Sequence, residues 1–185
     1  MPFTLTKSSP LPGVLVVSPT LHPDGRGTFF ELYKRSEYRA LGIADDFVQD
    51  NFSHSVAGVV RGLHFQYPPS PQAKLVSVVN GRILDAIVDI RRGSPAYGRW
   101  FSIELSSENR KSLYVPEGFA HGFAVLSDQA DVLYKVSGEF DPEAEGGIRW
   151  NDPAVGIAWP LTDPIVSPRD AALPTLAELD NKFVY

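Results

Sequence analysis

The chain of 185 residues contains no cysteine and a single methionine. Without cysteine it can form no disulfide framework, no thiolate zinc site and no cysteine nucleophile. It also lacks any stretch approaching the roughly 20 consecutive apolar residues that a membrane helix needs. Its 17 basic residues are dispersed and are outnumbered by 22 acidic ones. These absences argue against a membrane protein and a broad nucleic-acid surface, so we expect a soluble cytoplasmic protein.

The composition is that of an ordinary folded protein. Hydrophobic residues make up 43% of the chain and charged residues 21%, which argues against disorder and coiled coil. The length suffices for one well-buried core and is short for two. We therefore predict a single domain over residues 1–185.

Short β-rich segments separated by turn residues dominate the sequence and predict an all-β sandwich or barrel. The expected strands are Val14–Val17, Thr28–Tyr33, Phe47–Phe52, Val59–Phe65, Leu75–Val79, Ile83–Ile90, Trp100–Leu105, Ser112–Val115, Gly122–Leu126 and Val132–Val136.

Asn80-Gly81 separates two of these strands and is a pair that tolerates positive φ at both central positions of a type I′ turn. The pair predicts a hairpin over Leu75–Ile90. In its second strand, Asp85 and Asp89 are four residues apart and so lie on the same face, while the other residues are mostly apolar. This pattern is typical of a strand that lines a polar cavity.

Helical signals are weak and peripheral. Ser36–Leu41 could form one or two turns capped by Ser36, and Leu173–Leu179 could form a short C-terminal turn. The segment Pro142–Pro174 is rich in loops, and we expect this tail to wrap the β-core.

Two of the four histidines lie in unusual contexts. His64 follows a strand that carries Arg61, and His121 lies in a Pro-x-Gly-x-x-His turn. Both segments resemble the two sequence motifs of the cupins, which are jelly-roll barrels. However, Gln66 stands where a second metal-binding histidine should be, and Ser70-Pro71 stand where the carboxylate should be, so we expect no metal site. By itself His64 could be a base beside an anion-binding arginine or a buried structural histidine.

Taken in order, the motifs resemble the dTDP-4-dehydrorhamnose 3,5-epimerase family from about Pro12 to Pro174. The segments that carry the resemblance are Arg61–Gln66, Gln72–Val76, Val88–Arg91, Pro116–Phe123, Tyr134-Lys135 and Ile148–Pro153. The resemblance implies an isomerase that inverts both carbons beside the ketone of a dTDP-linked 4-keto-6-deoxyhexose, without cofactor or metal. It also implies a homodimer with exchanged N-terminal strands.

The same resemblance implies four catalytic roles. His64 is the base, Asp170 orients its ring, Lys74 faces the keto oxygen, and Tyr134 is the acid on the far face. Removing a weakly acidic hydrogen beside a carbonyl requires this set of groups. In isolation the better interpretation of each would be structural, with Lys74 an exposed strand lysine and Tyr134 a core aromatic whose hydroxyl is solvated.

The implied substrate contacts come from several separate segments. They are Arg26, Glu31, Gln49, Asp50, Asn51, Arg61, His121, Phe140, Glu145 and Arg169. Two of them depart from the family. Phe140 replaces the frequent tyrosine that stacks on thymine, which keeps the stacking face and loses a hydroxyl. Arg169 replaces a frequent lysine, which preserves the charge and changes the donor geometry.

The sequence leaves three alternative functions open. The chain could invert one carbon only, it could be a ketoisomerase that moves the carbonyl, or it could be a non-catalytic cupin that binds a nucleotide sugar.

Overall fold

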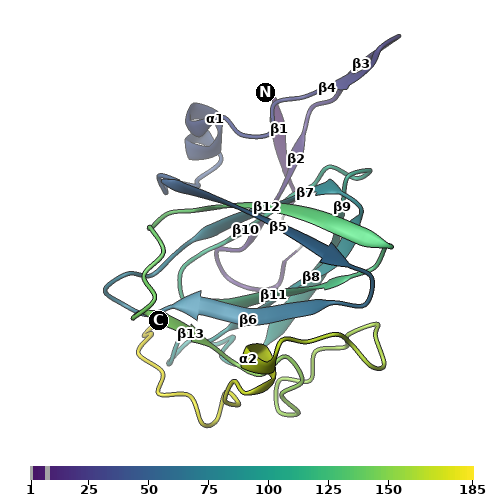
Figure 1. Cartoon of the computed structure of the whole chain (residues 1–185). Helices are drawn as coiled ribbons and strands as arrows, with labels where there is room; N and C mark the ends of the chain where they lie inside the picture. Colours follow the sequence, from purple (N-terminus) through teal and green to yellow (C-terminus); the bar gives the residue numbers. More distant parts are fainter. Residues whose placement is uncertain (1, 7–8) are drawn as a thin grey trace.

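The computed structural model describes residues 2–6 and 9–185, and it is built from two antiparallel sheets packed face to face (Figure 1). The first sheet has the strand order β1-β2-β10-β7-β12-β5, and the second has the order β13-β6-β11-β8-β9. The prediction of an all-β jelly roll with short peripheral helices is confirmed. Residue 1 and residues 7–8 of the predicted single domain lie outside the described residues.

The strands are mostly those that the sequence predicts, with shifted ends. Their bounds are β1 Phe3–Thr6, β2 Leu15–Pro19, β3 His22–Asp24, β4 Gly27–Phe29, β5 Gln49–Val56, β6 Val60–Gln66, β7 Lys74–Asn80, β8 Arg82–Asp89, β9 Trp100–Ser106, β10 Ser112–Val115, β11 Phe119–Val125, β12 Gln129–Val136 and β13 Glu145–Gly147. The sequence did not indicate β1, β3 or β13. Only residues 28–29 of the predicted strand 28–33 are in a strand, as part of the two-stranded β3–β4 hairpin.

The predicted hairpin at Asn80-Gly81 is wrong. Strands β7 and β8 belong to different sheets, and each has its hydrogen-bonding edges filled by other strands. Only Gly81 of the pair has a positive φ, of 78°, and a Cβ there would lie 2.1 Å from the Gln129 carbonyl oxygen. Position 81 therefore needs glycine, because the chain turns sharply there from one sheet to the other and leaves no space for a Cβ.

Both helix predictions need correction. Helix α1 spans Arg35–Ala40, and its N-cap is Lys34 rather than Ser36, with no side-chain capping bond. No helix forms at residues 173–179. The short helix α2, Pro168–Ala171, lies just before it, where the Ser167 hydroxyl accepts a hydrogen bond from the Asp170 amide. In the described residues, no helix is long and apolar enough to cross a membrane.

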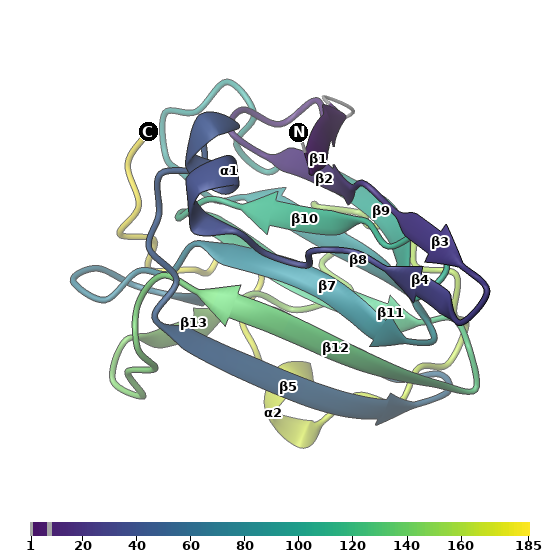
Figure 2. The same ribbon diagram turned by 90° about the horizontal axis from the view of Figure 1, so that it is seen from above.

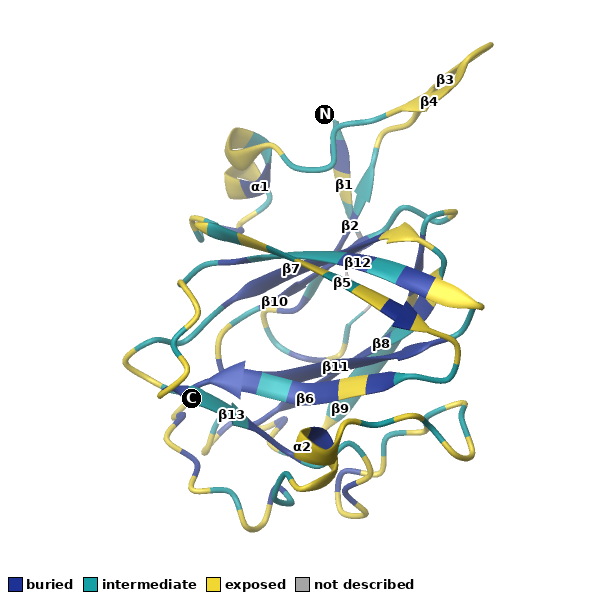
Figure 3. Ribbon diagram, in the orientation of Figure 1, coloured by how far each residue is buried: buried dark blue, intermediate teal, exposed yellow. Residues whose placement is uncertain are grey.

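The apolar core lies between the sheets, and further layers cover part of their outer faces (Figure 3). The C-terminal tail packs Ile148, Val155, Leu176 and Phe183 on the second sheet, so the prediction of a wrapping tail is confirmed. On the first sheet, α1 covers the end near β2 and β10. Figure 2 shows that β5 and β12 lie beyond this cover.

Candidate active site

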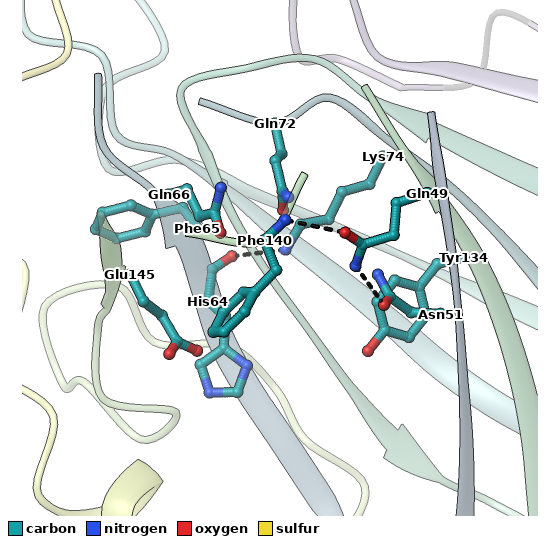
Figure 4. Close-up of a pocket in the computed structure, with 10 residues that line it drawn as sticks. All are labelled: Gln49, Asn51, His64, Phe65, Gln66, Gln72, Lys74, Tyr134, Phe140 and Glu145. Carbon is teal, nitrogen blue, oxygen red and sulfur yellow. Dashed lines mark hydrogen bonds between the residues drawn. The ribbon is translucent and has the colours of Figure 1, made fainter. Parts of the chain in front are cut away.

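Three of the four catalytic residues and several of the binding residues predicted from the sequence meet in one cavity between the sheets. The cavity has a volume of about 150 Å³ and is lined by Gln49, Asn51, His64, Phe65, Gln66, Gln72, Lys74, Tyr134, Phe140 and Glu145 (Figure 4). An adjoining cavity of about 240 Å³ shares four of these residues and adds Arg61 and His121. Strands from both sheets contribute to these walls, so the site depends on the packing of the whole fold.

His64 forms a dyad with Asp170 from the C-terminal tail. The His64 Nε2 lies 2.8 Å from Asp170 Oδ1, and the Gly62 amide donates to the other carboxylate oxygen at 2.9 Å. Burial opposes the charge of Asp170, but hydrogen bonds from His64, Gly62 and Ser167 outweigh it and lower the pKa of the carboxyl. The carboxylate therefore stays ionised, orients the imidazole, and leaves Nδ1 as the nitrogen able to accept a proton.

Close packing of two glycines sets the spacing of the strands that carry the histidines. In the register of β6 and β11, His64 pairs with His121. A Cβ at Gly62, whose φ is 113°, would lie 2.6 Å from the Gly122 Cα. Both positions therefore need glycine, and this brings the two imidazoles to neighbouring places on one sheet.

His121 forms a second dyad, with a carboxylate that we did not select from the sequence as a site residue. Its Nε2 lies 3.0 and 2.9 Å from the two oxygens of Asp85, which is fully buried on β8. The signal for Asp85 was an acidic residue within an otherwise apolar strand, because a buried carboxylate requires a partner. What the sequence could not supply was the identity of that partner.

Lys74 is buried, 8% exposed, and is not a surface lysine. Its Nζ donates to the His64 carbonyl oxygen at 3.1 Å (Figure 4). Burial lowers the pKa of Lys74 from 10.5 to about 8, although the charges of Asp85 and Glu145 oppose this decrease. At neutral pH the site therefore holds a poorly hydrated ammonium group, which interacts strongly with any negative charge that forms beside it.

Tyr134 lies on the side of the cavity opposite His64 (Figure 4), and it comes from β12 of the other sheet. Burial raises the pKa of its phenol, and the charge of Arg61 partly counteracts the rise. Tyr134 is thus a neutral proton donor at physiological pH, placed across the cavity from a proton acceptor.

Further predicted binding residues line the two cavities or lie beside them. Arg61 donates from Nε to the Ser55 hydroxyl at 2.9 Å, which bridges β6 and β5. The Glu145 carboxylate on β13 forms an ion pair with Arg169 on α2. Since Arg169 is adjacent to Asp170 and its side chain is 59% exposed, the helix that orients His64 also presents a cation at the rim.

Three predicted binding residues lie apart from this cluster within one chain. Asp50 is on the outer face of β5, where its carboxylate pairs with Lys135 Nζ at 2.8 Å. The strand alternation explains this, because the flanking residues 49 and 51 both line the cavity. The β3–β4 hairpin projects from the body of the fold (Figure 1). On it Arg26 pairs with Asp24, and Glu31, which follows the hairpin, lies 3.8 Å from Lys34.

This arrangement can remove a proton on one side of a bound molecule and return one on the other side. Lys74 adds a positive charge for an oxygen that becomes anionic between the two steps. In the part of the chain that the structure describes, no group of three or more His, Asp or Glu side chains could hold a metal ion.

Comparison with known proteins gives consistent matches along the chain. A family model described as dTDP-4-dehydrorhamnose 3,5-epimerase matches residues 8–178. The chain is 47% identical over 168 residues to the dTDP-4-dehydrorhamnose 3,5-epimerase of Salmonella typhimurium, covering 90% of this chain and 92% of that protein. The M. tuberculosis protein of the same name is 45% identical over 173 residues, with 91% and 86% covered.

Solved structures show the same similarity in three dimensions. The dTDP-6-deoxy-D-glucose-3,5-epimerase of Legionella pneumophila, in complex with dTDP-4-keto-L-rhamnose, superposes with a TM-score of 0.94 at 42% identity, covering 99% of this chain and 98% of that chain. A 3′-monoepimerase of Streptomyces bikiniensis, in complex with dTDP-quinovose, gives a TM-score of 0.83 at 36% identity, covering 89% and 84%.

Proposed function

The chain belongs to the dTDP-4-dehydrorhamnose 3,5-epimerase family of isomerases, and from this premise we propose that it inverts carbons 3 and 5 of dTDP-4-dehydro-6-deoxy-D-glucose. The product is dTDP-4-dehydro-L-rhamnose. The reaction needs no change of oxidation state, because each inversion only removes and returns a proton. We propose that the side chains of the chain perform it without a cofactor.

In this mechanism His64 Nδ1 takes the proton from the carbon beside the ketone. The electron pair of the broken C–H bond moves onto the keto oxygen and forms an enolate, which the Lys74 ammonium stabilises. Tyr134 then returns a proton to the opposite face of the same carbon, and the carbonyl re-forms. Asp170 stabilises the imidazolium that exists between the steps, and exchange with solvent restores His64 and Tyr134 for the second carbon.

The proposed substrate contacts follow the positions of the charged and aromatic side chains. Arg61 and Arg169 lie near the rim and suit the diphosphate, because guanidinium groups bind phosphate oxygens in a bidentate manner. The Phe140 ring is 53% exposed at the mouth and is free to stack on thymine. His121 and Glu145 line the inner cavity and suit the sugar hydroxyls.

A single observation carries the proposal. An imidazole held by an ionised carboxylate and a neutral phenol face one cavity from opposite sheets, and a buried ammonium lies in the same cavity. A sugar-binding protein without activity has no need for a buried lysine with a lowered pKa, which costs stability.

The experiment that tests the function is proton NMR of the purified protein with dTDP-4-keto-6-deoxyglucose in deuterated water. We expect exchange at both carbons beside the ketone, and conversion to the L-rhamno product when the partner reductase is supplied. Exchange at one carbon would identify a single-centre epimerase. Movement of the carbonyl would indicate a ketoisomerase. Binding without exchange would indicate a sensor.

We also propose a homodimer, because the predicted binding residues Arg26 and Glu31 lie outside the cavity of their own chain. The β3–β4 hairpin projects from the body, and its Phe29 is 69% exposed (Figure 3). The outer face of β5 and β7 exposes Phe52, Val56 and Val79 in addition. An apolar face beside a projecting arm is typical of an interface through which a second copy completes the site.

Two measurements test the dimer. Light scattering should give about twice the chain mass of 20.3 kDa. Mixed refolding of inactive Arg26→Ala with inactive His64→Asn should restore activity, because one of the two sites then combines a native arm with a native cavity. A monomer, or a mixture without activity, would contradict the exchanged arrangement.

A further inference from the structure

Phe140 is an exposed aromatic residue on a loop whose backbone is bonded to side chains from both sheets. The ring is half-exposed at the mouth of the cavity, in the connection between β12 and β13. Residues 137–144 belong to no strand, so β-ladder bonds do not fix the ring. Stacking on a base requires a ring that is already in place, because ordering a mobile loop reduces affinity.

Gln66 bonds to the backbone on both sides of Phe140. Its Nε2 donates to the Glu139 carbonyl oxygen at 3.3 Å and to the Ser70 carbonyl oxygen at 2.7 Å. Its Oε1 accepts from the Asp141 amide at 2.9 Å. The side chain, which is 3% exposed, thus joins the loop before and after the aromatic residue to β6.

A second glutamine holds the same point from the other sheet. The Phe140 amide donates to Gln49 Oε1 at 2.9 Å, and Gln49 Nε2 donates to Asn51 Oδ1 at 2.8 Å (Figure 4). Residues 139–141 are therefore fixed by one glutamine from each sheet. Gln49 was predicted as a binding residue, whereas Gln66 was considered only as a missing metal ligand.

The chemistry of the side chain explains why glutamine occupies this position. A primary amide supplies two N–H donors and one acceptor, and Gln66 uses all three. A neutral imidazole offers one donor and one acceptor, and a carboxylate offers no donor for the two carbonyl groups. Gln66 stands where a metal-binding cupin would carry a histidine, and here its side chain holds the loop that carries Phe140.

We propose that Gln66 is a positioning residue that holds Phe140 ready to stack on the nucleobase, and so sets the affinity for the nucleotide. This inference rests on the proposed function, since it requires a dTDP-linked substrate. Gln66 acts through Phe140 and takes no part in proton transfer.

Calorimetric titration with dTDP tests the inference through Gln66→Leu. Base–aromatic stacking contributes a factor of about ten to one hundred in affinity, and we expect Gln66→Leu to weaken dTDP binding by about tenfold. Inorganic pyrophosphate, which has no base, should bind the variant and the wild type equally. In turnover, KM should rise by about tenfold while kcat changes by less than about threefold.

A double-mutant cycle separates positioning from direct contact. In a Phe140→Ala background, Gln66→Leu should cause no further loss of dTDP affinity, because the ring through which it acts is gone. An undiminished tenfold loss in that background would overturn the proposal, since Gln66 would then act on the nucleotide by another route. Unchanged dTDP affinity in the single variant would also overturn it.

Two further variants separate these outcomes from a folding defect. Gln66→Met keeps the unbranched chain and should show the same loss if Gln66→Leu does not fold. Ser137→Ala removes a hydrogen bond to the Ala73 amide at the start of the same loop and should leave dTDP affinity within about twofold. A loss in Ser137→Ala equal to that of Gln66→Met would contradict a specific role. Failure of the wild type to bind dTDP would refute the proposed function instead.

Discussion

The buried ammonium of Lys74 makes the pH dependence of this enzyme predictable. The group must be charged to stabilise an enolate, and burial lowers its pKa to about 8. The activity should therefore fall as the pH rises through about 8, with a tenfold loss for each further pH unit. Tyr134 cannot produce this limb, because burial raises its pKa from an ordinary value of 10.0.

The same shift predicts how stability depends on pH. Below about pH 8 the folded protein holds a buried charge, whereas the unfolded chain keeps the usual pKa of 10.5. Since the unfolded chain binds more protons between these values, the Lys74 contribution to stability rises with pH across this interval. The decrease in the Lys74 pKa from 10.5 to about 8 lowers the free energy of unfolding by about 3 kcal/mol at neutral pH. About 2 kcal/mol of this loss is regained by about pH 9.5, because the folded protein has then released the proton.

The assay compares the wild type with Lys74→Met in two measurements. In the residual activity of the variant, kcat/KM should no longer decrease as the pH rises through about 8. In urea unfolding, the stability of the variant relative to the wild type should decrease by about 2 kcal/mol between about pH 7 and pH 9.5. The lost hydrogen bond to the His64 carbonyl oxygen is common to both pH values and cancels in this comparison.

Two results would refute the reasoning. A limb near pH 8 that persists in Lys74→Met would assign it to another group. A difference in stability that does not change with pH would show that the ammonium is not destabilised by burial.

Other variants test the remaining contacts. His64→Asn and Tyr134→Phe should each lower kcat by at least about 10²-fold, measured by solvent deuterium exchange; near-native rates would remove the assigned role. Asp170→Asn should lower kcat with little change in dTDP affinity, because the imidazolium loses its counter-charge. Asp85→Asn should move the alkaline limb to lower pH, because it removes a charge that raises the lysine pKa; an unmoved limb argues against this coupling. Gly81→Ala should lower the melting temperature by several degrees, because the glycine has a positive φ and no space for a Cβ.

The sequence predicted the type and place of most strands because each carries a local signal. Residues 112–115 form a strand at the predicted bounds, and Asp85 and Asp89 are fully buried on the same face of β8 as the core residues Ile83 and Ile87. The short strands β1, β3 and β13 carry three or four residues each, too few for a clear alternation, and β13 pairs with β6, which is distant in sequence. Their formation is decided by pairing, which a local pattern does not contain.

The Asn80-Gly81 prediction failed for a similar reason. A positive φ at a glycine is compatible with a type I′ hairpin and equally with a sharp crossing between sheets. A hairpin can form only if β7 and β8 each have an unpaired edge. Here β7 is already paired with β10 and β12, and β8 with β11 and β9. Competition for strand edges is a property of the whole sheet, so the dipeptide could not reveal it.

For the site, the residues that the sequence missed are those whose role lies in holding another residue. His64, Lys74 and Tyr134 have chemistry of their own and follow from the family resemblance. Asp85 bonds to the His121 ring, and Gln66 bonds to the backbone on either side of Phe140; only the fold shows those contacts. Gln66 stands where the cupin motif has a metal-binding histidine, and that mismatch did not indicate that its amide holds a loop. A buried polar side chain must satisfy its hydrogen bonds somewhere, so identifying its partners in the structure turns such residues into testable parts of the mechanism.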